Sequence, residues 1–140
     1  MRSRYLLVAL SLVVAFSATR RAAAIKPFYD EFKKDYIENS ENKKFAEEAG
    51  KPPVGCYICH QGKEKKVRNA FGKEVGKLLN KKDAKDTAKM DDAFKKALEM
   101  HVDAKDDKSE TYMDRIKAGK FPAGDLEELK KEPPKDPAAK

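Results

Sequence analysis

The chain has 140 residues, and its 31 basic and 24 acidic residues give a formal net charge of +7. Residues 1–24 contain four arginines and no acid, so the rest of the chain has 27 basic against 24 acidic residues and a formal charge of +3. This near balance argues against a nucleic-acid-binding protein, which usually presents a strongly basic face. The length after residue 24 suits one small domain with a modest apolar core.

Residues 1–24 have the layout of an export signal. Two arginines precede an apolar run over residues 5–18, and small residues occupy positions 22–24. We expect cleavage after Ala24, with a cut after Ser17 as the alternative. The apolar run is shorter than the roughly 20 residues that a membrane-spanning helix needs. We therefore expect an exported protein, in the periplasm or an equivalent space, with no stable membrane span after signal removal.

Apolar residues that recur every three or four positions predict helices through the rest of the chain. The expected helical segments are 25–37, a continuation over 45–49 that Gly50 ends, 67–80, 87–104, a short helix capped by Ser109, and 125–131. No alternating pattern indicates a strand. The fold class expected is therefore all-α, with one domain over residues 25–131 and a disordered, solvated tail over 132–140.

A stiff, proline-containing segment at 51–55 leads into Cys56-Tyr57-Ile58-Cys59-His60, and these are the only two cysteines of the chain. This spacing allows both thiols to form thioethers with the vinyl groups of one haem, while the adjacent imidazole ligates the iron. The pattern predicts one covalently bound haem c. Cys56 and Cys59 are its expected attachment sites, and His60 is the expected proximal axial ligand of the iron.

Three other interpretations of the two cysteines are weaker. A thiol–disulfide oxidoreductase places this pair at a helix N-terminus on a sheet, and no strand is expected here. Zinc would need Cys56, Cys59 and imidazoles from both His60 and His101, but the adjacent Cys59 and His60 cannot both easily reach one tetrahedral ion. With only His101 left, a ligand is missing. A structural disulfide would close too small a loop to stabilise the fold much.

The motif, with helices before and after it, resembles a small single-haem class I-type cytochrome c. The resemblance covers most of residues 26–131, although only residues 56–60 are specific to the family. It implies a helical domain wrapped around one haem that carries electrons between redox proteins, without an enzymatic reaction of its own. Nothing in the sequence resembles a set of catalytic acid, base and nucleophile.

The chain departs from the family at the second iron ligand. Where the family usually has a methionine followed by proline, this chain has Phe121 and Pro122, and phenylalanine cannot ligate iron. His101 and Met113 are the leading candidates for the distal ligand, ahead of two further methionines, Met90 and Met100. Helical periodicity places His101 at the centre of an apolar stripe.

A further alternative is that no protein residue ligates the iron on its distal face. It would make the chain a five-coordinate haem protein that binds or senses a small gas. A more distant alternative is a secreted helical protein without haem, held by a structural disulfide.

Basic residues crowd the chain just after the motif, at Lys63, Lys65, Lys66, Arg68, Lys73 and Lys77. A basic surface around an exposed haem edge would attract an acidic redox partner. The alternative is an ordinary solvated helix face, because Glu64 and Glu74 interrupt the run. Arg68 or Asn69 is also a candidate contact for a haem propionate.

Overall fold

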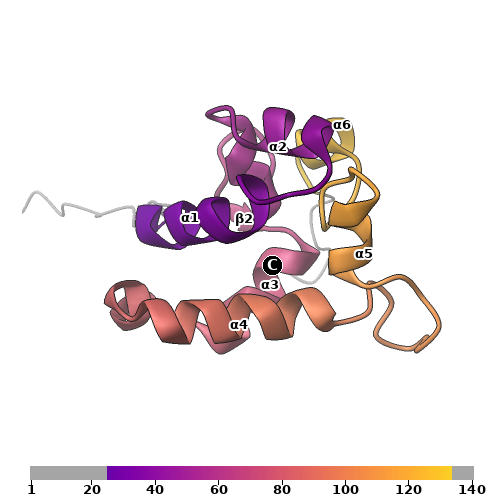
Figure 1. Ribbon diagram of the computed structural model, residues 1–140. Coiled ribbons are helices and arrows are strands. Elements are labelled where there is room, and N and C mark those ends of the chain that lie inside the picture. The colour runs from indigo at the N-terminus through magenta and orange to yellow at the C-terminus, as the bar shows by residue number, and fades with distance from the viewer. Residues whose placement is uncertain (1–24, 134–140) are drawn as a thin grey trace, which may run out of the picture.

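The computed structural model describes residues 25–133. The expected export signal at 1–24 and residues 134–140 of the expected tail lie outside the described residues. The described chain is mostly helical, as the sequence predicts (Figure 1). None of its helices has the length and apolar character needed to cross a membrane.

The elements follow one another along the chain with short connections. Their bounds are α1 (Lys26–Phe32), the π-helical turn η1 (Lys33–Ile37), α2 (Lys43–Ala49), the 3₁₀ turn η2 (Val54–Ile58), β1 (His60–Gln61), β2 (Val67–Arg68), α3 (Ala70–Leu78), the 3₁₀ turn η3 (Lys81–Lys85), α4 (Thr87–Glu99), α5 (Tyr112–Lys117) and α6 (Leu126–Leu129).

Three helices form the part of the core that matters for the site. In Figure 1, α1 and α4 lie one above the other with α3 between them. Phe32 of α1 meets Phe71 of α3 and Phe94 of α4 edge-on, with ring centroids 5.8 and 5.3 Å apart. All three side chains are buried, and each edge-to-face pair adds about 0.5–1.5 kcal/mol beyond the burial of its area. This aromatic cluster fixes α1 against α3 and α4.

Phe121 is a core residue in this fold. It is 3% exposed, and its ring lies 5.8 Å from that of Phe45 in α2. The contact ties α2 to the turn that precedes α6. The position where the family resemblance would place a ligating methionine is therefore used for packing.

The expected helix at 87–104 ends earlier than its apolar pattern predicts. The structure ends α4 at Glu99, and Met100 already has extended backbone torsions. The amide of Tyr112 donates to the carbonyl of Met100, and His101 forms an isolated bridge with Thr111. Docking of α5 therefore takes over the backbone groups that a longer helix would have used.

The cap of α5 is Thr111, two residues later than the Ser109 expected from the sequence. The Thr111 hydroxyl accepts from the amide of Asp114, whose carboxylate accepts from the amide of Thr111. This reciprocal arrangement satisfies two amides at once. The Ser109 hydroxyl instead donates to the carbonyl of Asp106.

The expectation that the chain has no strand was wrong on a small scale. β1 and β2 form a two-stranded antiparallel pair, with His60 opposite Arg68 and Gln61 opposite Val67. Gly62 and Lys65 have positive φ angles of 81° and 51° and turn the chain back on itself. Strands of two residues are too short to leave an alternating pattern in the sequence.

The prolines before the motif predict an extended entry, which the structure does not have. The peptide bond between Pro52 and Pro53 is cis, and the chain then winds into η2, which carries Cys56. Gly55 in this turn lies directly against the ring of Tyr29, where an added Cβ would come within 2.3 Å of the phenolic oxygen. The motif is thereby packed against α1.

Candidate haem site

Cys56, Cys59 and His60 line one cavity, which we call the motif cavity. It has a volume of about 180 Å³. Its walls come from α1, α3, η3 and α4, and the apolar side chains in them include Phe28, Phe32, Val75, Leu79 and Phe94. The three motif residues that the sequence singles out are thus brought together at an apolar pocket, although its walls come from distant parts of the chain.

Positive charge is concentrated in the polar part of this lining. Lys66, Arg68 and Lys81 contribute to the cavity, and no aspartate or glutamate occurs among the described residues that line it. These three residues are exposed, so the lining suits a ligand whose apolar body is buried and whose acidic side groups lie at the surface. A haem with its two propionates has that character.

The His60 imidazole is partly buried beside a cation. His60 and Arg68 face each other across the β1–β2 pair, so their side chains leave the same side of it. Burial lowers the pKa of the His60 imidazole, the backbone at Val67 acts against this, and the Arg68 guanidinium lowers it further. The imidazole is therefore neutral at neutral pH, the form in which histidine binds a metal.

One nitrogen of the same ring is left without a partner. Within residues 25–133, no group forms a hydrogen bond with the fully buried Nδ1 of His60. A buried polar atom in this state costs about 1–3 kcal/mol. The imidazole thus has one nitrogen whose hydrogen-bonding capacity is unused in this structure.

The environment of the two thiols does not favour redox exchange between them. Burial raises the pKa of the Cys59 thiol to about 12, the Arg68 guanidinium acts against this rise, and Cys56 adds to it. A thiol–disulfide oxidoreductase needs the opposite, a cysteine whose pKa is lowered so that it is a thiolate. Both cysteines are free thiols in this structure.

The motif side chains are also too dispersed for a tetrahedral zinc ion. Across the described chain, only Glu31, Asp35 and Asp91 gather three potential ligand atoms within 4.8 Å of one another. Cys56, Cys59 and His60 do not form such a group, although they share a cavity wall. Thiols that attach to the periphery of a macrocycle and an imidazole that reaches its centre do not need to converge on one point.

Two glycines of α3 allow the motif and Arg68 to approach closely. A Cβ on Gly72 would lie 2.0 Å from the carbonyl oxygen of Cys59, and a Cβ on Gly76 would lie 1.9 Å from Nη1 of Arg68. The guanidinium of Arg68 therefore lies close to the backbone of α3 at the cavity. The cavity is smaller than the roughly 300–1,000 Å³ of pockets that enclose a whole ligand. A haem would thus keep an edge outside or displace this flexible side chain.

Asn69 is the residue near the site whose role sequence analysis missed. The sequence makes it a candidate propionate contact, but its side chain is buried and donates to the carbonyls of Tyr57, Ile58 and His60. The available signal was an asparagine at the start of a predicted helix, which indicates a cap. That signal does not reveal the bonds to the motif.

The four candidates for a distal iron ligand lie apart from the lining of the motif cavity. Met90 is buried in the core, and Met113 packs against it from α5. Met100 and His101 line a second, more open depression that we call the polar hollow. The identity of the distal ligand stays a prediction.

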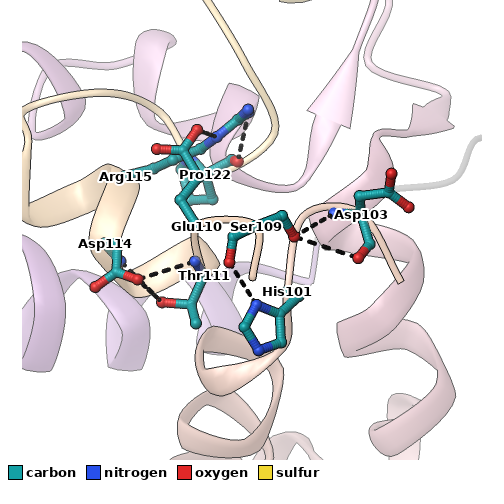
Figure 2. A network of polar contacts seen from close by, with 8 residues as sticks. All are labelled: His101, Asp103, Ser109, Glu110, Thr111, Asp114, Arg115 and Pro122. Atoms are coloured by element: carbon teal, nitrogen blue, oxygen red, sulfur yellow. Dashed lines mark hydrogen bonds and ion pairs between the residues drawn. The ribbon is translucent and has the colours of Figure 1, made fainter. Parts of the chain in front are cut away.

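The polar hollow lies between β2, α3 and the loop that follows α4. Its lining includes Lys73, Glu74, Met100, His101, Asp103 and Lys105. Figure 2 shows His101 in this loop with Nδ1 against the carbonyl of Ser109, at 2.5 Å, and the other ring nitrogen directed away from it. Arg115 anchors the same loop through Glu110 and the carbonyl of Pro122.

The basic residues after the motif do not form one surface. Lys66 lines the motif cavity, Arg68 lines both the cavity and the polar hollow, and Lys73 and Lys77 line only the hollow. The ammonium group of Lys65 lies 5.2 Å above the ring of Tyr57. Only the first two cations are placed at the candidate haem site.

Comparisons with protein-family models, with curated proteins and with solved structures each find no match for this chain.

Proposed function

We propose that this chain is a c-type cytochrome that carries electrons, alone or as the haem module of a redox chain. The observation that carries the proposal is the placement of Cys56, Cys59 and His60 in the wall of one apolar cavity with a basic lining. The thiols would hold one haem c covalently, and the His60 imidazole would ligate its iron. When bound, the haem would supply the one-electron chemistry.

The chain's own residues would then bind the group and control its surroundings. Phe28, Phe32 and Phe94 would exclude water from the macrocycle, because they form the apolar walls of the cavity. Lys66 and Arg68 would attract the propionates and hold that edge of the group near the surface. An acidic redox partner could approach the same edge. Export to the periplasm or an equivalent space is part of the proposal, since c-type haem is attached outside the cytoplasm.

Covalent attachment is the decisive test. The full chain is produced together with a haem c maturation system, denatured, and weighed by mass spectrometry. We expect one haem per chain in the wild type and none in the double variant Cys56→Ala, Cys59→Ala. His60→Ala should attach much less haem and change the visible spectrum of whatever is attached, because the imidazole would hold the group in place while the thioethers form. An unmodified mass for the wild type would overturn the proposal.

A second function is favoured by the positions of the four distal candidates. Because Met90, Met100, His101 and Met113 lie outside the cavity lining, an iron bound by His60 could keep its other face open to a small gas. The reduced protein distinguishes the two functions when carbon monoxide is added. An unchanged spectrum supports the electron carrier, and a shifted spectrum supports a gas-binding haem protein.

A further inference from the structure

Asn69 bonds to an unusual run of carbonyl groups in the motif. Its side chain is buried, and the amide nitrogen lies 2.8, 3.1 and 3.2 Å from the carbonyl oxygens of Tyr57, Ile58 and His60. Its backbone nitrogen donates to the carbonyl of Cys59 at 3.0 Å. Four consecutive carbonyls of the motif are therefore bonded to one residue.

The opposite end of the same side chain starts a helix. The amide oxygen of Asn69 accepts from the backbone nitrogen of Gly72 at 2.9 Å and so caps α3. Only an amide has two donor hydrogens and an acceptor on so short a side chain. Aspartate keeps the acceptor but loses the donors, and serine has one hydroxyl in place of both groups. Asparagine is thus the residue type that this position requires.

These bonds fix the backbone on both sides of the His60 Cα atom. The peptide plane before it contains the Cys59 carbonyl, and the plane after it contains the His60 carbonyl. Asn69 bonds to both. The direction of a Cα–Cβ bond follows from the orientation of the two planes beside it. The imidazole therefore leaves the chain in a direction that Asn69 determines.

We propose that Asn69 is a positioning residue that holds the His60 imidazole toward the haem iron. This inference rests on the proposed function, because it concerns the ligand of that haem. Partners of a metal-binding histidine usually act on the ring itself. Here the support acts on the backbone, while Nδ1 of the ring has no hydrogen-bond partner among residues 25–133.

The experiment compares two asparagines that have the same chemistry in different places. Asn42 caps α2 by accepting from the amide of Phe45 and donates its amide nitrogen to the carbonyl of Lys117, and neither partner belongs to the motif. Asn69→Asp and Asn42→Asp each keep a cap acceptor and lose the amide donor. Asn69→Ser keeps a capping hydroxyl without introducing a charge, which covers the case in which the aspartate variant does not fold.

Each full-length variant is produced with the haem c maturation system, and three quantities are measured: covalent haem per chain, visible spectrum and reduction potential. We expect about tenfold less attached haem in Asn69→Asp and Asn69→Ser, with a changed spectrum and a shifted potential in the haem-bearing fraction. Asn42→Asp should match the wild type in all three. A general loss of stability would not change the potential of molecules that had acquired haem.

The outcomes separate the two proposals. If the wild type carries haem and Asn69→Ser has its spectrum, potential and haem content, the role of Asn69 is overturned while the cytochrome proposal stands. If Asn42→Asp loses as much haem as the Asn69 variants, the effect is one of capping or folding, and the role is again overturned. If the wild type acquires no covalent haem, the proposed function fails and the positioning role fails with it.

Discussion

The motif cavity and the polar hollow are neighbours that share Arg68 in their linings, yet they are built differently. The hollow is the larger, at about 1070 Å³ against about 180 Å³, but it is open and has carboxylates and cations side by side. The cavity is narrower, with aromatic walls and cations alone as its charged groups. Size is therefore a poor guide here, and the chemistry of the lining identifies the cavity as the candidate cofactor site.

The largest expected effect on stability comes from a substitution at Gly72, which lines the motif cavity. Gly72→Ala places a methyl group against the carbonyl of Cys59, and backbone cannot move aside cheaply. We expect a loss of about 3 kcal/mol or more in the free energy of unfolding, measured by urea denaturation, together with little attached haem. Gly76→Ala is the matched control, because its methyl group meets only the flexible end of Arg68. Equal stability of the two variants would contradict this account.

A smaller effect is expected when each region loses one positive charge. Arg68→Gln removes a cation that lies beside His60, so the oxidised, more positive iron should become easier to form. We expect the reduction potential of the haem-loaded protein to fall by about 50 mV, or about 1.2 kcal/mol for one electron. Lys105→Gln removes a cation from the polar hollow and should leave the potential nearly unchanged. Equal shifts would erase the distinction between the two regions.

Removing the histidine of the polar hollow should have a still smaller effect on the haem. His101→Ala breaks the contact with the Ser109 carbonyl, and we expect about 1 kcal/mol of lost stability. The visible spectra of the oxidised and reduced protein should not change, because His101 lies outside the motif cavity. Met113→Ala tests the other leading distal candidate in the same way. Loss of a low-spin spectrum in either variant would identify that residue as the distal ligand.

The smallest expected effect concerns the acidic group between α1, η1 and α4. Burial raises the pKa of the Asp91 carboxyl, and the nearby carboxylates of Asp35 and Glu31 raise it further, while Lys34 acts against them. The folded state therefore holds this proton more tightly than the unfolded chain. The resulting stability is complete below the ordinary aspartate pKa and is lost as pH rises through the raised value.

The asparagine side chain of Asp91→Asn cannot ionise, so this variant should not lose stability as the pH rises. We expect the variant to be a few tenths of a kcal/mol more stable than wild type at neutral pH, with no such gain well below pH 4, when urea denaturation is repeated across pH. Asp92→Asn on the same helix is the control, because Asp92 is paired with Lys96. A gain in stability at acid pH instead of neutral pH would contradict a raised pKa for Asp91.

The helices and the motif could be predicted from sequence because their signals are local. Phe28, Phe32 and Tyr36 recur at the helical period, and the spacing of Cys56, Cys59 and His60 is itself the chemical signature. The end of α4 could not be predicted, because the extended backbone at Met100 depends on a bond from Tyr112, which the apolar pattern does not contain.

The same reason applies to the parts of the site that sequence analysis missed. The bonds of Asn69 reach back 9 to 12 residues to carbonyls, and carbonyls are present at every position. The displacement of His101 from the cavity follows from the early end of α4. The sequence therefore could not reveal which backbone groups would form hydrogen bonds with each side chain.

The contacts of Asn69 also suggest an order of events as the chain folds. They span a dozen residues at most, and loops of about ten residues close in roughly 10–100 ns. The aromatic wall instead joins Phe32 to Phe94, which lie far apart along the chain, and such distant contacts form late. A newly made chain would thus reach the contacts of the motif before the aromatic wall of the cavity closes.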